Sequence, residues 1–219
     1  MRGEVSAIAA LVLCLGASPE AVSEPPVLVT EETALPVGAE DRRDDGVLRD
    51  ESGRPVTHRL LGKILPTFEA PKVGGGTIRS LDLEGRWTVM VVWGVWCHDS
   101  RNDMDNIAAI ATHYESDDAV DFISVHVPQN KETLDKMYRN YRSVAGFFDD
   151  RGVSFATALD ETADLRASLQ IDWTPTYLLI GPDLTVKGFR TDLSKGGETA
   201  VADFIGAVDA RVAHVETPG

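Results

Sequence analysis

Residues 87–104 read WTVMVVWGVWCHDSRNDM and contain a junction between two kinds of secondary structure. Residues 87–95 are an almost continuous apolar run rich in β-branched side chains, which is typical of a strand covered on both faces. Beyond residue 100, Met104, Ile107 and Tyr114 recur at the spacing of an amphipathic helix. The pattern therefore predicts a buried strand followed at once by a helix, with Cys97 at the junction.

The same alternation continues along the chain. The GPDL linker at 181–184 is short enough to favour an antiparallel hairpin between the two strands beside it. The expected strands are 87–95, 119–127, 153–159, 176–180 and 185–189, and the expected helices are 100–116, 130–144, 162–170 (opened by Thr162) and 197–212. Strands that alternate with helices and end in a hairpin predict an α/β fold, a three-layer α/β/α sandwich with a central mixed sheet.

The ends of the chain differ in composition from its middle. Residues 1–23 contain a short apolar run followed by small residues, which predicts a secretory signal peptide. Residues 24–59 are acidic and contain prolines, so they are expected to form a tether, with a hairpin around the turn-rich DESGRP sequence. One folded domain is expected over 60–213, with a tail at 214–219.

The signal peptide predicts an exported protein, periplasmic or secreted, which would be membrane-anchored if the signal stays uncleaved. No transmembrane span is expected after cleavage. The formal net charge is −14 and the basic residues form no run, so nucleic acid is not an expected partner. His58, His113 and His214 are expected on the surface.

The chain contains two cysteines. Cys14 lies in the signal region, and Leu13 before it argues against lipidation, which needs a small residue there. Signal cleavage would leave Cys97 as the only cysteine, and an unpaired cysteine in an exported chain is either a reactive thiol or a buried bystander.

Cys97 lies where local chemistry can activate a thiol. At a helix N-terminus its sulfur would face unpaired backbone N–H groups and the positive end of the helix dipole, which stabilise a thiolate. His98 adds positive charge when protonated, and Ser100, one turn on, could donate its hydroxyl to the sulfur. Asp99 opposes both effects with a nearby negative charge.

Two segments carry a resemblance to a known family. Residues 83–104 (LEGRWTVMVVWGVWCHDSRNDM) place a Trp-Cys pair at the end of a buried strand, and 172–189 (DWTPTYLLIGPDLTVKGF) place a Thr-Pro before another. Over residues 60–213 the chain resembles the thioredoxin superfamily, specifically its exported TlpA/ResA-like branch. The resemblance implies a thioredoxin-like fold in which Pro175 is a cis-proline beside the cysteine.

The resemblance also implies roles for residues around Cys97. The backbone of Thr174 would pair with an extended substrate segment, and Trp96 and Trp173 would border the substrate cleft. Asp103 matches an acidic position of the family motif and would be a proton relay. Val91 stands where many relatives carry an acid, so that proton carrier is absent.

This chain departs from the family at Ser100, which replaces the second cysteine of the C-x-x-C motif. A two-cysteine protein releases its mixed disulfide by attack of the second thiol, and Ser100 cannot perform that step. The expected activity is therefore thiol–disulfide exchange of the oxidoreductase or isomerase type through Cys97, tuned by His98 and Ser100, with Pro175 beside it. The expected partners are exported protein thiols or disulfides and glutathione-like small thiols, one of which would resolve the adduct.

Three other functions stay open at this point. The first is a redox-inactive module that binds exported proteins in the same cleft. The second is a peroxiredoxin-like activity, although the upstream VVWGVW sequence lacks the hydroxyl and proline which that chemistry uses. The third is copper or zinc binding by His126 with Cys97 and His98, which no ligand spacing supports. We therefore expect no metal and no cofactor.

Overall fold

The computed structural model describes residues 26–33, 45 and 47–215. The predicted signal peptide, Cys14 and most of the C-terminal tail lie outside the described residues, so the domain boundaries stay a prediction. None of the helices in the described ranges combines the length and apolar character that crossing a bilayer requires.

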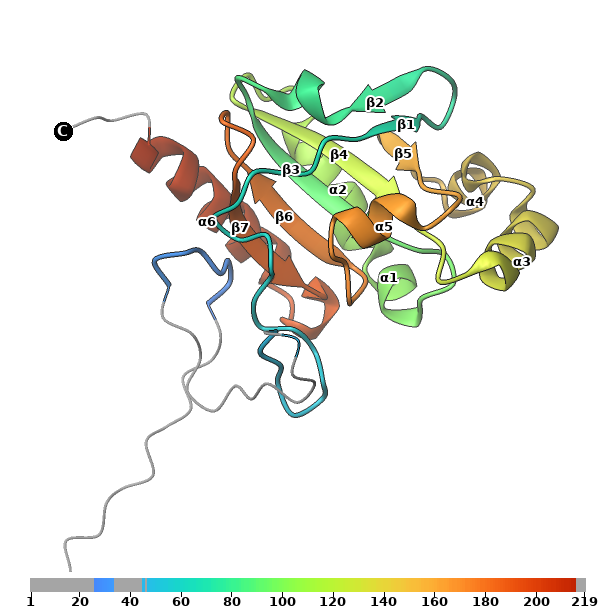
Figure 1. Ribbon diagram of the computed structural model, residues 1–219, viewed down its shortest axis with the longest axis horizontal. Helices are drawn as coiled ribbons and strands as arrows, with labels where there is room; N and C mark the ends of the chain where they lie inside the picture. The colour runs from blue at the N-terminus through green and yellow to red at the C-terminus, as the bar shows by residue number, and fades with distance from the viewer. Residues whose placement is uncertain (1–25, 34–44, 46, 216–219) are drawn as a thin grey trace, which may run out of the picture.

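A five-stranded sheet forms the centre of the fold, in the order β5-β4-β3-β6-β7 (Figure 1). β3, β4 and β5 run parallel, whereas β6 and β7 are antiparallel to their neighbours. The strands are β3 Trp87–Trp93, β4 Val120–His126, β5 Thr157–Leu159, β6 Thr176–Ile180 and β7 Val186–Thr191. The predicted mixed sheet and its terminal hairpin are therefore confirmed.

Four helices cover one face of the sheet. Val89, Val91 and Trp93 of β3 point toward this face, because successive side chains of a strand alternate between faces. The helices that pack there are α2 Met104–Tyr114, α3 Lys131–Tyr141, α4 Val144–Arg151 and α6 Ala200–Val215. The apolar residues Met104, Ile107 and Tyr114 are buried in this layer, as their spacing predicts.

The opposite face of the sheet carries a thinner layer. Met90 and Val92 of β3 point into it. Its elements are the two-stranded sheet β1 Glu69–Pro71 with β2 Thr77–Arg79, the 3-10 helix η1 Ser80–Leu83 and the short helix α5 Asp164–Ser168. The three-layer α/β/α arrangement is confirmed, with one outer layer built largely from strands and loops.

Three helices differ from the sequence-based expectation. The predicted helix 100–116 is interrupted at Asp103, which separates α1 His98–Asn102 from α2. The predicted helix 162–170 is shorter, because Ala163 adopts a left-handed conformation and α5 begins only at Asp164. Helix α4 was not predicted, although Ser143 caps its first turn and Gly152 ends it in the left-handed region.

Two N-terminal segments pack against the domain. Val29 forms an antiparallel bridge with Phe189 at the outer edge of β7. Arg49 and Pro55 form a second antiparallel bridge, around the turn that the DESGRP sequence predicts. The prediction that His58 lies on the surface is wrong: it is buried, because its ring stacks on Phe189 of β7 with centroids 5.4 Å apart. The 3-10 helix η2 Leu193–Lys195 then leads from β7 to α6.

Candidate functional site

Cys97 lies between β3 and α1, where the sequence places it. It is the residue that precedes the first turn of α1, and its amide donates to the carbonyl oxygen of Gly94 over 3.0 Å. The residue is partly exposed, and among the described residues it is the only cysteine. Cys97 therefore lies at the N-terminus of a helix, with no other described cysteine to bond with.

The sulfur of Cys97 faces the loop before β6. Its thiol donates a hydrogen bond to the carbonyl oxygen of Thr174 over 3.1 Å. The Thr174–Pro175 peptide bond is cis, and both residues are buried. The structure thus brings together Cys97, Thr174 and Pro175, which the resemblance places at one site.

Ser100 is near Cys97 but does not bond with its sulfur. The Ser100 side chain is fully buried, and its hydroxyl oxygen accepts the amide of Gly94 over 3.2 Å. The hydroxyl therefore supports the turn between β3 and α1 rather than the thiol. The expected hydrogen bond from Ser100 to the sulfur is not formed.

His98 and Asp99 lie on the exposed side of the first turn. The His98 side chain is 74% exposed, and its Nδ1 lies 3.6 Å from a carboxylate oxygen of Asp99. The same nitrogen lies 3.1 Å from the side-chain amide of Asn102. Neither residue has a hydrogen bond with Cys97, so any influence of His98 on the thiol acts through charge.

Trp96 forms a wall beside Cys97. Its indole Nε1 donates to the carbonyl oxygen of Val127 over 2.8 Å, which ties the loop after β3 to the loop after β4. The guanidinium carbon of Arg166 lies 5.4 Å from the centre of the Trp96 ring, in a cation–π contact. Trp173, on the other loop, is partly buried, and its buried indole N–H has no partner within the described part of the chain.

Asp103 is buried rather than exposed on a helix surface. Its carboxylate accepts hydrogen bonds from the hydroxyl of Tyr177 at 2.9 Å and from the amide of Leu193 at 2.7 Å, with Ser194 and Asn106 as further donors. Burial raises the pKa of the Asp103 carboxyl, against the hydrogen bonds that lower it. No hydrogen bond joins Asp103 to Cys97, so its role as a proton relay stays a prediction.

His126 lies under the Cys97 loop. It is buried at the end of β4, and its Nε2 accepts the amide of Val95 over 3.4 Å. Burial lowers the pKa of His126 to about 4, so the ring is neutral near pH 7. Within the described ranges, no group of three or more His, Cys, Asp or Glu side chains could hold a metal ion.

A model of the AhpC/TSA family matches residues 61–189, which is more than half of the chain. The chain belongs to the AhpC/TSA family. No curated protein matches the sequence of this chain.

Solved structures resemble this AhpC/TSA-family protein at low sequence identity. A candidate protein disulfide isomerase from Bacteroides thetaiotaomicron is 17% identical, with a TM-score of 0.55 over 69% of this chain and 89% of its own. A DsbF homologue from Corynebacterium diphtheriae is 14% identical, with a TM-score of 0.52 over 79% and 99%. An exposed lipoprotein thioredoxin from Streptococcus pneumoniae is 17% identical, with a TM-score of 0.51 over 66% and 99%. These similarities confirm the predicted thioredoxin-like fold.

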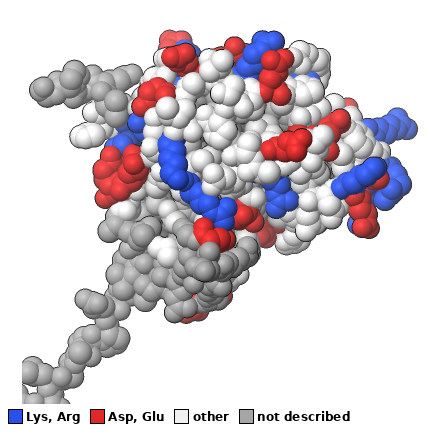
Figure 2. Space-filling view, viewed as in Figure 1, with Lys and Arg blue, Asp and Glu red and all other residues white. Residues whose placement is uncertain are grey.

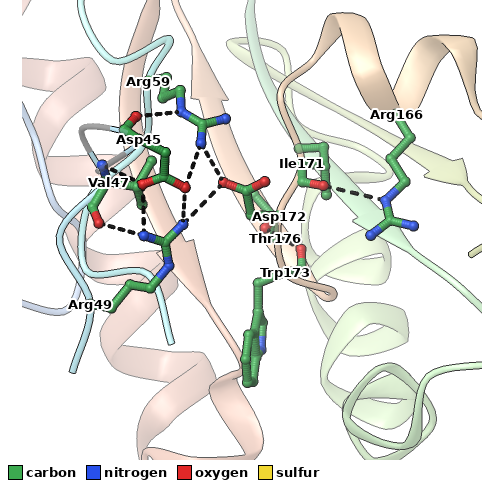
Figure 3. Close-up of polar contacts among 9 residues, drawn as sticks. All are labelled: Asp45, Val47, Arg49, Arg59, Arg166, Ile171, Asp172, Trp173 and Thr176. Carbon is green, nitrogen blue, oxygen red and sulfur yellow. Dashed lines mark hydrogen bonds and ion pairs between the residues drawn. The ribbon is translucent and has the colours of Figure 1, made fainter. Parts of the chain in front are cut away.

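An ion-pair cluster in this AhpC/TSA-family protein supports the loop that carries Thr174 (Figure 3). Asp172, two residues before Thr174, lies 3.1 Å from a guanidinium nitrogen of Arg59 and 3.5 Å from one of Arg49. Asp45 bridges the same two arginines at 2.7 and 2.9 Å. The hydrogen bond from Arg49, together with its charge and that of Arg59, keeps the pKa of the Asp45 carboxyl well below its usual range.

Arg166 supports the same loop from the other side. Its Nε donates to the carbonyl oxygen of Ile171 over 3.3 Å, and its guanidinium reaches the carbonyl oxygen of Pro128 at 3.3 Å. Since it also contacts Trp96, Arg166 connects the loops on both sides of Cys97. The sequence shows only isolated arginines at these positions, so reasoning from the sequence missed them.

Proposed function

We propose that the protein catalyses thiol–disulfide exchange through Cys97 as its only reacting thiol. The observation that carries the proposal is the sulfur of the partly exposed Cys97 at the start of α1, 3.1 Å from the carbonyl oxygen of Thr174, with serine one turn on. The candidate protein disulfide isomerase from Bacteroides thetaiotaomicron and the DsbF homologue from Corynebacterium diphtheriae support this chemistry through the fold that they share with this chain.

The exchange begins when the Cys97 thiolate attacks one sulfur of a substrate disulfide. The Cys97–substrate bond forms as the substrate S–S bond breaks, and the second substrate sulfur leaves as a thiolate that takes a proton from water. Ser100 has no sulfur with which to displace the substrate. Once signal cleavage has removed Cys14, a thiol from outside the chain must therefore attack the mixed disulfide and return Cys97 to its thiolate.

The loop before β6 offers backbone groups for an extended substrate. Thr174 is almost fully buried, and within the described part of the chain its amide has no hydrogen-bond partner. We assign this amide to pairing with the substrate backbone, beside Pro175, while Trp96 and Trp173 border the segment. His98 and Ser100 tune Cys97 by charge and by holding the turn, and Asp103 is assigned to proton relay.

The N-terminal sequence supports an exported location for this activity. An apolar run followed by small residues is typical of a signal peptide, and export with cleavage of that peptide would place a protein that keeps Cys97 alone among oxidised partners. The proposed substrates are exported protein thiols and disulfides, and the proposed location is periplasmic or secreted. The protein would be membrane-anchored if the signal is retained.

Trapping of a mixed disulfide tests this function. The protein is incubated with scrambled, disulfide-containing ribonuclease, quenched with acid and analysed by mass spectrometry of the Cys97 peptide. We expect a covalent Cys97–substrate species that a small thiol releases, and regain of ribonuclease activity. The Cys97→Ala variant should give neither, whereas Ser100→Ala should still form the adduct.

A second function, binding without exchange, is favoured by one observation. The Thr174 amide and its buried hydroxyl both lack partners among the described residues, so the cleft could hold an extended segment even if the thiol is inert. Equal binding of a reduced, unfolded chain by the parent and by Cys97→Ala, with no adduct in either, would support this reading over exchange.

A further inference from the structure

A small pocket lies beside the Cys97 loop, between α1 and α3. Its volume is about 130 Å³, and Trp96 and Met137 supply an apolar part of its lining. The polar part includes Arg101, Lys136 and Asn140. The pocket is smaller than the roughly 300 Å³ at which drug-sized ligand sites begin, so it fits a small chemical group.

The pocket is adjacent to Cys97 along the chain on both sides. Trp96 immediately precedes the cysteine, and the amide of Arg101 donates to the carbonyl oxygen of Cys97 over 3.2 Å. Cys97 itself does not line the pocket, so a group joined to its sulfur would reach the pocket by extending along the Trp96 ring toward α3.

Among the residues that the structure describes, the two cations at the pocket have no carboxylate partner. Arg101 and Lys136 are exposed, and neither forms an ion pair with an acid in the described ranges, whereas Lys131 on the same helix pairs with Asp135 at 2.8 Å. The whole chain has a formal net charge of −14. Figure 2 shows basic side chains gathered at the right-hand end of the molecule, where α3 lies in Figure 1. Two unpaired cations at one pocket, in so acidic a protein, favour an anionic ligand.

We propose that this pocket binds the carboxylate of a small thiol while that thiol is disulfide-bonded to Cys97. The proposal rests on the exchange function of Cys97 and names the class of its external thiol, a low-molecular-weight thiol that carries a carboxylate. Arg101 and Lys136 attract the carboxylate, and Trp96 and Met137 contact the short apolar chain between carboxylate and sulfur.

The adduct forms in one balanced exchange. The Cys97 thiolate attacks a sulfur of the symmetric disulfide R–S–S–R, the new Cys97–S–S–R bond replaces the R–S–S–R bond, and one R–S⁻ leaves. In the reverse direction, R–S⁻ attacks a Cys97–substrate disulfide at the Cys97 sulfur and releases the substrate thiolate. A second R–S⁻ then removes R as R–S–S–R and regenerates Cys97.

Three small disulfides of similar size but different charge test the pocket. The full chain is treated with the disulfides of 3-mercaptopropionate (anionic), 2-mercaptoethanol (neutral) and cysteamine (cationic), and the Cys97 peptide is followed by mass spectrometry. Each rate is divided by the rate of the same reagent with a free cysteine peptide. We expect the normalised rate for the anionic reagent to exceed the neutral one by about fivefold at low salt, and the preference to shrink in roughly 1 M salt.

Charge-neutral variants locate the preference. Arg101→Gln and Lys136→Gln should each lower the anionic preference, and the double variant should abolish it. Arg139→Gln is the matched control, because Arg139 is exposed on the same helix but does not line the pocket. If Arg139→Gln lowers the preference for the anionic disulfide as much as Arg101→Gln and Lys136→Gln do, the proposed carboxylate site is wrong. Equal normalised rates for all three disulfides in the parent would also overturn it. Failure of Cys97 to react with any disulfide, while iodoacetamide still labels it, would instead contradict the exchange function itself.

Discussion

The thiol of Cys97 donates to the carbonyl oxygen of Thr174 over 3.1 Å, although 77 positions separate the two residues along the chain. The contact follows from the sheet, because β3 and β6 are antiparallel neighbours in which Val92 lies opposite Thr176. Cys97 follows the end of β3 and Thr174 precedes the start of β6, so the two loops lie at the same end of these antiparallel strands. Residues that hold either loop should therefore affect the reactivity of the thiol.

Ser100→Cys should convert the single-thiol site into a two-thiol site. The new sulfur would lie one helical turn after Cys97 and could attack a mixed disulfide within the molecule. A methylthio adduct placed on Cys97 should then be lost more than about tenfold faster without added thiol, because the attack is intramolecular. Mass spectrometry of the Cys97 peptide measures this loss. The Ser100→Ala variant should keep the adduct, and an equally long-lived adduct in Ser100→Cys would contradict the assigned geometry.

Gly94→Ala should displace the loop that carries Trp96 and Cys97. A Cβ at Gly94 would lie 2.3 Å from Trp96 Nε1 and 2.7 Å from the carbonyl oxygen of Val127, so it cannot fit beside their hydrogen bond. We expect a loss of about 1–3 kcal/mol in the free energy of unfolding, measured by urea denaturation, and a changed alkylation rate of Cys97.

The matched control for Gly94 is Gly206 in α6. A Cβ there would meet no atom within 4 Å, and alanine is the better helix former. Gly206→Ala should therefore leave stability unchanged or raise it by about 0.5–1 kcal/mol, with unchanged Cys97 alkylation. If Gly94→Ala and Gly206→Ala change the free energy of unfolding and the Cys97 alkylation rate by similar amounts, the crowding at Gly94 is refuted.

Arg49→Met should weaken the support of the loop before β6. The Arg49 side chain is 1% exposed and pairs with Asp45 and Asp172, so among the described residues its removal leaves Arg59 as the one arginine beside the two carboxylates. We expect a loss of about 2–3 kcal/mol in the free energy of unfolding. Because Asp172 and Thr174 share a loop, alkylation of Cys97 should also become faster well below the unfolding transition.

Arg79→Met provides the comparison for Arg49. Arg79 pairs with Glu69 in an exposed ion pair, so its loss should change stability by less than about 1 kcal/mol and leave Cys97 unaffected. An unaltered Cys97 alkylation rate in Arg49→Met, despite the loss of stability, would show that the ion-pair cluster does not position the thiol site.

His126 should make the protein less stable in mild acid. Burial lowers its pKa from 6.5 to about 4, so between these values the unfolded chain binds a proton that the native state does not. Stability therefore rises with pH across this window and is lost as pH falls through it, by ~2 kcal/mol between pH 7 and pH 4.5.

His126→Gln tests the acid dependence. The glutamine amide oxygen can still accept the Val95 amide but does not titrate, so the loss of stability between pH 7 and pH 4.5 should shrink in this variant. Urea unfolding at the two pH values gives the difference. Burial also lowers the pKa of His58, so part of the acid dependence should persist. If the parent and His126→Gln lose the same free energy of unfolding between pH 7 and pH 4.5, His126 is not the source of the acid dependence.

Most of the sheet could be predicted from local patterns. β3, β4 and β6 are runs of apolar and β-branched residues, and the short linker before β7 indicates its hairpin. α4 was missed, although its caps, Ser143 and Gly152, are visible in the sequence, because the pattern of the predicted helix 130–144 ends at Val144, where α4 begins. The break of the first helix at Asp103 had no local signal, since it depends on partners in β6 and η2.

The position of Cys97 could be predicted because it follows from its neighbours in sequence, a buried strand before it and a helix after it. The support of the opposite loop could not. Arg49 and Asp172 are 123 positions apart, and nothing in either local sequence indicates that they pair. The same holds for Lys136 beside Trp96, which the packing of α3 brings to the Cys97 loop.

Residue type and local periodicity were enough to predict the strands of the central sheet, most of its helices, and the place of Cys97 after a buried strand with a serine one turn on. The surroundings of the Cys97 thiol depend on tertiary packing: the Thr174 carbonyl, the arginines that hold the Thr174 loop, and the pocket beside Trp96 with its two cations. Such contacts join residues distant in the chain, and they form only when the packing of the apolar core sets the register of the strands and the position of the helices.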